Sequence, residues 1–552
     1  MKFIKQLILL VFMIGSFQAM AGVNLKNGNF YISYTDIVVN GLGKKLEMTR
    51  TYNSKSTSVG WFGFGWGNYY ETKLVTSADG CVVVHEHGAG GKTRFCPKNS
   101  IDPETAANKI IAAMRKSNGL TESSVETFKK RLVNNAELRH AYAKNFGVKT
   151  EIASGTKLYS NQRGIQEVTV TKEGYVRSSN DGRVESFNKL GQLVKVQDKN
   201  NYFVEFKYDK KQLESIKDSH AKQIYFKWNS SGKVAEMWSQ GDKKAEFKYD
   251  GQDLVYSKDV TGNEYQFVYD KNHNLTKIVY NPNKKKGEPE DAMKMSYSAK
   301  TYYVTEIVDR NGESTKYKYG AADKNPEDHY WTEVTKTGFN GQPVTNKYEY
   351  EIKTRPDGSR YTYRIETQIN GIKTETIYSE CCGLPLKIAR GKHVTNFEYN
   401  DDGLLVKKSS TKGEFVKIEY DQKLKKISKV INGKDWTEFD YDKKGNLVKA
   451  KNNKGKAVLL IYNTKGKITK MVDKEVQKGK SVERMLSFTY NSLGKPEIIK
   501  MEKVGQIMVK YDNYGDIKRV ESKDGHKMAL QVTQAFQNLL AIVKPAGVNL
   551  NM

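Results

Sequence analysis

The sequence has little proline and little cysteine. Of its 552 residues, 10 are proline and 4 are cysteine, whereas 34 are tyrosine and 21 are phenylalanine. This composition is not that of a disordered chain and favours β-strands. Beyond the N-terminus there is no run of about 18 apolar residues, so we expect no membrane-spanning helix in the mature chain. The length suits two or more ordinary domains or one large repeat array.

The N-terminal residues are typical of a secretory signal peptide. Two lysines precede an apolar run at 7–14, and residues 19–21 read Ala-Met-Ala, a small-x-small cleavage site. The apolar run is too short to span a bilayer, and no cysteine follows the site to carry a lipid. We therefore expect residues 1–21 to be removed. The mature chain, starting at Gly22, would then be periplasmic, on the cell surface or secreted.

Acidic residues are in deficit. Lysine and arginine number 91 against 63 acidic residues, a net charge of +28 that becomes +26 once Lys2 and Lys5 are removed. Such a charge favours anionic partners, among them lipopolysaccharide, teichoic acid, acidic lipid and nucleic acid. The lysines are spread along the chain, which is also the pattern of a solvated outer face. Because export argues against nucleic acid, we expect anionic envelope glycans or a partner protein.

The few cysteines suggest one disulfide. Cys81 and Cys96 flank a Gly-Ala-Gly-Gly turn at 88–91, which places them nearly opposite each other on a hairpin. An oxidising compartment permits the bond, and closing a loop of this length is worth up to about 3 kcal/mol. Cys381 and Cys382 are adjacent, and the sequence leaves open whether they form a vicinal disulfide or stay as thiols.

A tyrosine followed by Asp or Asn recurs along the chain at intervals of about 21 residues. Such regularity is the signature of a repeat protein. The C-terminal series is Tyr399, Tyr420, Tyr441, Tyr462, Tyr490 and Tyr511, and the N-terminal series is Phe187, Tyr208, Trp228, Tyr249 and Tyr269. A looser stretch between them contains Tyr297, Tyr319, Tyr350 and Tyr378.

Each unit reads as a β-hairpin. In residues 437–462, short runs of alternating apolar and polar residues are separated by glycine-containing turns at 442–445 and 452–455. About fifteen such units would form one long antiparallel meander whose hairpins bury each other's faces.

The tyrosine would end a strand with its ring on the apolar face, and the Asp would open the turn by accepting backbone N–H groups. We therefore predict a structural role for these repeat residues rather than metal binding, since the Asp alternates with Asn. The clearest cases are Tyr208, Asp209, Tyr249, Asp250, Tyr269, Asp270, Tyr420, Asp421, Tyr441, Asp442, Tyr511 and Asp512.

These motifs resemble the RHS/YD-repeat family. The stretch "YDKKGNLVKAKNNKGKAVLLIYNTKGKITKMVD" is similar to the repeat consensus. The runs "VNLKNGNFYISYTDI", "LEMTRTYNS" and "GWFGFGWGNYYETKL" resemble the segment that precedes the repeats in bacterial RHS proteins. The resemblance implies a continuous β-sheet that spirals into a hollow shell or barrel, which in several relatives encloses a C-terminal toxin.

The chain departs from toxin-carrying relatives at its C-terminal end. Such relatives have a self-cleavage core with an Asp-Pro-x-Gly-Leu type motif, whereas the one Asp-Pro pair here is at 102–103. Only 40 residues follow Asp512, too few for an independent enzyme domain. We therefore expect neither a C-terminal toxin nor self-cleavage.

Two segments break the β pattern. Residues 102–146 read as two or three short amphipathic helices, starting at Asp102 and Pro103 and with a capping box at Ser123 and Glu126. This insert is either a cap over one end of the β structure, which we favour, or a partner-binding module. Residues 528–544 read as a further helix, a candidate plug, cap or docking peptide. Its expected buried face is Val532, Phe536, Leu540 and Val543, with Gln534 and Gln537 off that face.

Catalytic signals are poor. His85 and His87 alternate on a predicted strand and are weak candidate metal ligands, with no third ligand at useful spacing. Trp61 and Trp66 lie in an aromatic cluster that is suited either to stacking on sugar rings or to core packing. Known nucleophile, zinc-protease and phosphate-loop motifs are absent from the sequence. We expect no enzyme activity and no cofactor.

The sequence thus predicts an all-β protein with five parts. These are a signal peptide (1–21), an RHS-type β segment (22–100), an α-helical insert (101–150), a YD-repeat shell (151–527) and a helical tail (528–552). The main functional hypothesis is an exported scaffold that binds envelope glycans or a partner protein. The alternatives are a toxin-delivery shell that holds a separately encoded effector and, less favoured, a glycan-cleaving enzyme.

Overall fold

The computed structural model describes residues 21–544 except 42, 99–100, 118–123, 161–164, 211, 242, 283–289, 339–340, 478, 493, 513–516 and 524. All but the last residue of the predicted signal peptide, and the tail after residue 544, lie outside these residues. Within them no helix has the length and apolar character needed to cross a membrane.

Most of the chain forms one antiparallel sheet of 33 strands that pair in sequence order. This confirms the all-β prediction. The strands are β10 (Lys157–Ser160), β11 (Gln166–Val170), β12 (Gly174–Ser179), β13 (Val184–Asn188), β14 (Leu193–Gln197), β15 (Phe203–Asp209), β16 (Gln212–Asp218), β17 (Gln223–Trp228), β18 (Val234–Trp238), β19 (Lys244–Asp250), β20 (Asp253–Lys258), β21 (Glu264–Tyr269), β22 (Leu275–Tyr280), β23 (Ala292–Tyr297), β24 (Val304–Val308), β25 (Ser314–Ala321), β26 (His329–Thr337), β27 (Pro343–Thr354), β28 (Arg360–Ile369), β29 (Ile372–Tyr378), β30 (Pro385–Arg390), β31 (His393–Tyr399), β32 (Leu405–Ser410), β33 (Phe415–Tyr420), β34 (Ile427–Asn432), β35 (Asp435–Tyr441), β36 (Leu447–Asn452), β37 (Ala457–Tyr462), β38 (Ile468–Gln477), β39 (Lys480–Tyr490), β40 (Pro496–Met501), β41 (Gly505–Tyr511) and β42 (Ile517–Lys523).

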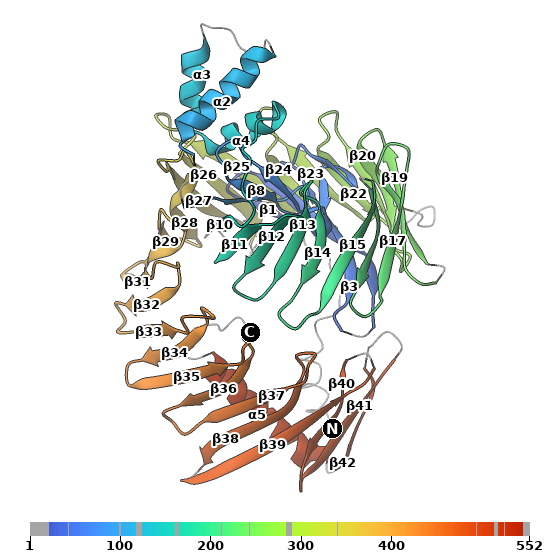
Figure 1. The fold of residues 1–552 in the computed structure, drawn as a ribbon, viewed down its shortest axis with the longest axis vertical. Coiled ribbons are helices and arrows are strands. Elements are labelled where there is room, and N and C mark those ends of the chain that lie inside the picture. Colours follow the sequence, from blue (N-terminus) through green and yellow to red (C-terminus); the bar gives the residue numbers. More distant parts are fainter. Residues whose placement is uncertain are drawn as a thin grey trace.

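The sheet curls twice. Figure 1 shows two coils stacked along the long axis and linked on one side by β27–β33. Among the described residues no ladder joins β10 to β42, so the sheet is an open coil and not a barrel closed by strand pairing. The edge of β10 is covered instead by the chain after β9, where Cys96 and Tyr159 exchange backbone hydrogen bonds of 3.1 and 2.9 Å.

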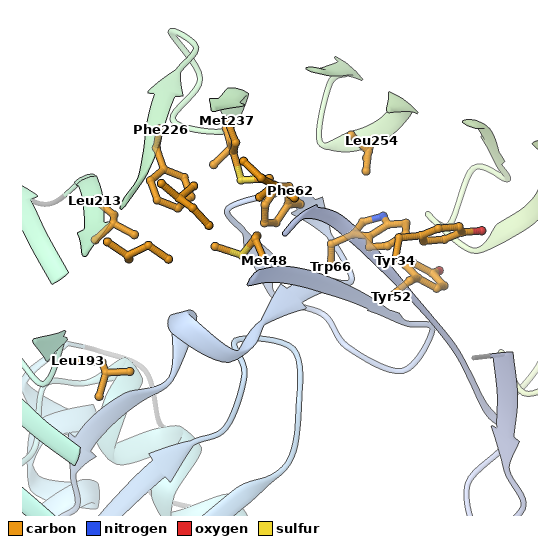
Figure 2. Packing of buried hydrophobic residues seen from close by; sticks show 14 of the residues in the cluster. Tyr34, Met48, Tyr52, Phe62, Trp66, Leu193, Leu213, Phe226, Met237 and Leu254 are labelled. Atoms are coloured by element: carbon orange, nitrogen blue, oxygen red, sulfur yellow. The ribbon is translucent and has the colours of Figure 1, made fainter. Parts of the chain in front are cut away.

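The N-terminal coil wraps around the segment that precedes the helical insert. That segment consists of β1 (Ala21–Asn24), β2 (Asn29–Val39), β3 (Leu46–Asn53), β4 (Val59–Gly60), β5 (Gly63–Phe64), β6 (Trp66–Asn68), the 3₁₀ helix η1 (Tyr69–Glu71), β7 (Lys73–Thr76), β8 (Val82–His85) and β9 (Lys92–Phe95). Figure 2 shows Met48, Phe62 and Trp66 of this segment packed beside Phe226, Met237 and Leu254 of the large sheet. The interior of this coil is therefore a filled hydrophobic core.

Backbone hydrogen bonds and a buried ion pair hold this segment in place. The large sheet bonds to it at two places: Leu74 N–H donates to the Gly191 carbonyl (2.9 Å), and Val234 N–H donates to the Trp61 carbonyl (2.9 Å). The Arg50 guanidinium is fully buried and donates to Asp36 (2.8 Å) and to Ser257 of β20 (2.7 Å). Burial raises the pKa of Asp36 to about 6. Because Arg50 reaches both sheets, it locks their relative position.

The C-terminal coil wraps around the helix α5 (Gly525–Val543), which lies against β36–β39, β41 and β42 (Figure 1). The helix begins at Gly525, earlier than predicted, and its expected buried face is only partly right, since Val543 is buried and Val532 is half-buried. Phe536 and Leu540 are exposed, whereas the buried residues are Met528, Ala535, Asn538, Leu539, Ile542 and Val543. The reason is that polar side chains help to dock this helix, as described below.

The strands between the coils form a single layer. Residues 361–410, all of them described, contain no buried residue. The two hydrophobic cores are accordingly separate, one ending near Tyr317 and the other starting near Leu405. The link between the coils therefore depends on strand pairing and on cross-strand side-chain contacts rather than on a core.

The insert forms three helices: α2 (Pro103–Lys116), α3 (Val125–Val133) and α4 (Ala136–Asn145). Asp102 caps α2 by accepting from Thr105 N–H (2.9 Å), with Pro103 in the first turn, as the sequence predicts. Ser123 of the predicted capping box lies outside the described residues, and α3 starts after Ser124 without a side-chain cap. Ala136 N–H donates to Gly358 (3.0 Å) in the β27–β28 turn, so the insert contacts that hairpin.

Candidate functional site

The repeat tyrosines anchor neighbouring hairpins to each other. The Tyr441 hydroxyl donates to the Ile427 carbonyl (2.8 Å), and the equivalent bonds of Tyr208, Tyr249, Tyr420 and Tyr511 measure 2.7–2.9 Å. The strand pairing shifts by a bulge immediately before each of these five tyrosines. Tyr420 and Tyr441 are half-buried, and burial raises the pKa of Tyr420 to about 12.

Tyr269 is used differently. Its hydroxyl accepts from the Trp66 indole N–H (2.9 Å), which ties the repeat array to the N-terminal segment. Trp66 is fully buried and cannot stack on a sugar, so core packing is correct for it. Trp61 is half-buried and packs edge-on against Phe226 and Trp228.

The repeat aspartates play two roles. Asp270, Asp421 and Asp442 open their turns as predicted, each accepting two backbone N–H groups (2.6–3.0 Å). Asp209 and Asp250 instead remain in the strand and pair with Gln212 and Asp253 across tighter turns. No group of three or more His, Cys, Asp or Glu suited to a metal occurs in the described part of the chain.

The cysteines form two disulfides. Cys81 and Cys96 are bonded to each other, and they lie where the β8–β9 register, with Val82 opposite Phe95, brings the two strand ends together. Cys381 and Cys382 are bonded in the exposed turn between β29 and β30. The structure thus gives a vicinal disulfide where the sequence left two alternatives.

The two candidate metal ligands, His85 and His87, do not face a common site. β8 ends at His85, and His87 lies in the following turn with a positive φ of 55°, against Tyr69. The prediction that they share a strand face is wrong because the glycine-rich turn starts earlier. His85 meets His140 of α4 instead, with 3.0 Å between their Nε2 atoms. Burial lowers the pKa of His85 to about 3 and that of His140 to about 4.

A cavity of about 870 Å³ lies between the two coils. Its wall on the N-terminal coil is polar and contains the buried Arg177, which donates to Glu86 (2.8 Å) and Glu185 (3.0 Å). Its wall on the C-terminal coil is apolar and aromatic: Tyr420, Tyr441 and Tyr462, at equivalent places on three hairpins, with Leu404, Ile427, Leu447, Leu460, Ile468 and Leu539 of α5.

Turns from the two coils meet at one side of this cavity, and we call this contact the seam. Lys199 Nζ donates to the Gly445 carbonyl (3.3 Å), and Asn446 Nδ2 donates to Asn200 Oδ1 (3.4 Å). Gly466 allows the approach, because a Cβ at this positive-φ residue would lie 2.3 Å from the Asn200 side chain. These two hydrogen bonds join turns that are 246 residues apart in the sequence, so side chains and not strand pairing connect the two coils on this side.

The turns of the C-terminal coil beside the cavity carry lysines. Lys423, Lys444 and Lys465 are exposed at intervals of 21 residues, and we call them the basic rim. Lys425 and Lys426 line the cavity itself. In the sequence this rim appears as a lysine two residues after the Asp or Asn of three successive repeats, a signal that the predictions above did not use. The cavity has no such signal, because its walls come from distant hairpins.

Comparison with known proteins gives a partial match. Residues 21–93 match the model of a family described as a domain of unknown function, DUF6531. None of the curated proteins matches the chain.

Solved structures with a similar arrangement include "TcdB2-TccC3 without hypervariable C-terminal region" (TM-score 0.44) and "TcdB2-TccC3" (TM-score 0.37), each 9% identical. The first match covers 96% of this chain and 29% of the other, and the second covers 90% and 30%. The chain thus spans less than a third of their length. A porin-like protein from Bacteroides uniformis matches at a TM-score of 0.12 and 9% identity, over 61% of this chain and 91% of its own.

Proposed function

We propose that this chain is an exported β-shell scaffold that acts by binding an anionic glycan of the bacterial envelope. The basic rim is the observation that carries this proposal. It places three exposed lysines on successive turns of one coil, and positive charges at one repeat distance suit a polymer with regularly spaced negative groups.

Some lysines elsewhere on the sheet are paired with glutamates. On the outer face of the C-terminal coil, Lys429 and Lys451 both bond to Glu438 (2.8 and 2.9 Å), and Lys417 bonds to Glu419 (3.1 Å). These pairs suit a solvated surface rather than a binding site. The three rim lysines form no ion pair with the described residues, so the proposal assigns the binding to them.

The size of the cavity weighs against the toxin-delivery alternative. About 870 Å³ is the size of a small-ligand site, and each coil already contains part of the chain itself, the N-terminal segment in one and α5 in the other. A separately encoded folded effector would need far more room. A partner protein that binds on the outside remains the second candidate.

Retention of the mature protein on an immobilised acidic polysaccharide tests the proposal. The rim variant replaces its three lysines by glutamine. A control with the same charge change replaces three lysines that are paired with glutamate on the outer face: Lys417, Lys429 and Lys451.

We expect wild type and control to be retained and to elute as salt rises, because screening weakens exposed charges beyond roughly 8 Å at physiological ionic strength. The rim variant should elute at lower salt. If the control variant also elutes at lower salt by the same amount, or if retention does not depend on salt, the positive charge serves solubility and not binding.

A further inference from the structure

The cavity beneath the basic rim contains two lysines without a partner of opposite charge. Lys199 and Lys426 both line it, and among the described residues neither forms an ion pair. Lys199 bonds only to a backbone carbonyl, at 3.3 Å, and the Lys426 ammonium lies 5.8 Å from the centre of the Tyr441 ring. By contrast, their neighbour Lys425 is paired with Asp402 (2.7 Å).

Both lysines lie against Gly445: Lys199 Nζ donates to its carbonyl (3.3 Å), and a Cβ added to this glycine would lie 2.8 Å from Lys426 Cε. Burial, and then the charge of Lys199, lower the pKa of Lys426, and Asp181 opposes this only in part. The Asp442 carboxylate feels the charge of Lys199, but its two oxygens already accept hydrogen bonds from Lys444 and Asn446. Two close cations in a partly buried site are unfavourable unless an anion lies between them.

The other residues that line the cavity indicate what kind of anion it would bind. On the polar wall the cavity is bordered by the amide side chains of Asn180 and Asn200 and by the carboxylates of Asp181, Glu86 and Glu185. Glu86 and Glu185 are paired with Arg177. Tyrosine rings with aliphatic residues form most of the opposite wall. Amides suit hydroxyl groups, and aromatic rings suit the apolar face of a sugar. A volume of about 870 Å³ accommodates a short oligosaccharide.

We propose that the cavity binds an acidic saccharide of one to three units, with its carboxylate or phosphate between Lys199 and Lys426 and a sugar face on the tyrosine wall. This deepens the proposed function, since such a saccharide would be either the end of the polymer held by the rim or a free fragment of it.

Isothermal titration of the full mature chain tests the site. The probes are a uronic acid trisaccharide, the neutral trisaccharide maltotriose and inorganic phosphate. Wild type should bind the acidic trisaccharide at least tenfold more tightly than either of the others, because only it offers both charge and sugar faces.

Lys199→Met and Lys426→Met should each weaken binding about tenfold or more, the usual effect of removing one charge-assisted contact. Lys426→Arg should retain most of the affinity. Lys417→Met, on the outer face and not lining the cavity, should bind as wild type. If one methionine variant fails to fold, the other supplies the result. Equal binding of maltotriose or of phosphate, or unchanged binding in both methionine variants, would overturn the assignment.

The same variants separate this site from the rim. If polymer retention falls in the rim variant but not in Lys426→Met, and Lys426→Met loses the trisaccharide, then the cavity takes free fragments. If both readouts fall in Lys426→Met, the cavity holds the polymer's end. Polymer retention by the rim with no trisaccharide binding to wild type would overturn the cavity assignment and leave the proposed function standing.

Discussion

The docking of α5 gives the sharpest test of how the C-terminal coil is held together. Arg484 of β39 is buried and donates to Asp473 directly across the ladder on β38 (2.7 Å) and also to Glu475. Asn538 of α5 donates to Glu475 (2.8 Å). Replacing Arg484 by methionine keeps the side chain's volume roughly but leaves two buried carboxylates next to each other.

Breaking a buried charge pair from one side costs about 3–5 kcal/mol. This equals a roughly 100- to 4,000-fold rise in the population of the opened form. Hydrogen exchange of the α5 amides, residues 525–543, measures that opening directly. We expect their protection in Arg484→Met to fall by this factor. Protection of β16–β24, in the separate N-terminal core, should be unchanged.

The pH dependence identifies the cause. Burial already raises the pKa of Asp473, and loss of the arginine raises it further. A carboxyl whose pKa is higher folded than unfolded stabilises the fold as pH falls, so acidification from pH 7.5 to 5.5 should restore part of the lost protection.

Two further variants control the interpretation. Arg519→Met removes an exposed arginine whose partner is Glu521 and should change stability by less than about 0.5 kcal/mol. Adding Asp473→Asn and Glu475→Gln to Arg484→Met should recover most of the loss, since no buried charge is then left. If Arg484→Met behaves like Arg519→Met, or its defect is the same at both pH values, the buried network does not hold the helix.

Three other predictions address the repeats, the link and the insert. Tyr441→Phe loses a hydroxyl-to-carbonyl bond and should lower the free energy of unfolding in urea by about 1–2 kcal/mol; no change would refute the anchoring role. Residues 361–410 should exchange amide hydrogens faster than the strands of either coil, since no core covers them, and equal protection would contradict this. His85 and His140 have lower pKa values folded than unfolded, so stability should fall by about 3 kcal/mol between pH 7 and 5, and replacing both by glutamine should flatten that part of the curve in urea titrations at each pH.

The features that could be predicted from the sequence are local. A Tyr-Asp phrase specifies a bulge, a turn and a hydroxyl bond to a carbonyl about 15 residues back, all within one repeat, so the period predicts the hairpin array. The Cys81–Cys96 bond likewise depends on the register of one short hairpin. The start of α2 follows from Asp102 and Pro103 alone.

Tertiary structure decided everything that joins distant repeats. The apolar residues of α5 occur on more than one face, so the sequence period alone wrongly predicts that Phe536 and Leu540 are buried. The face that is buried depends on the hydrogen bond from Asn538 to Glu475, which is 63 residues away in the sequence. The sequence left the role of Trp66 open between sugar stacking and core packing, and the structure decides it because the Trp66 indole N–H donates to Tyr269 in the core. The cavity exists only because turns that are 246 residues apart in the sequence meet at the seam. The physical reason is that the curvature of a sheet is the sum of small twists over many strands, and no short stretch of sequence specifies that sum.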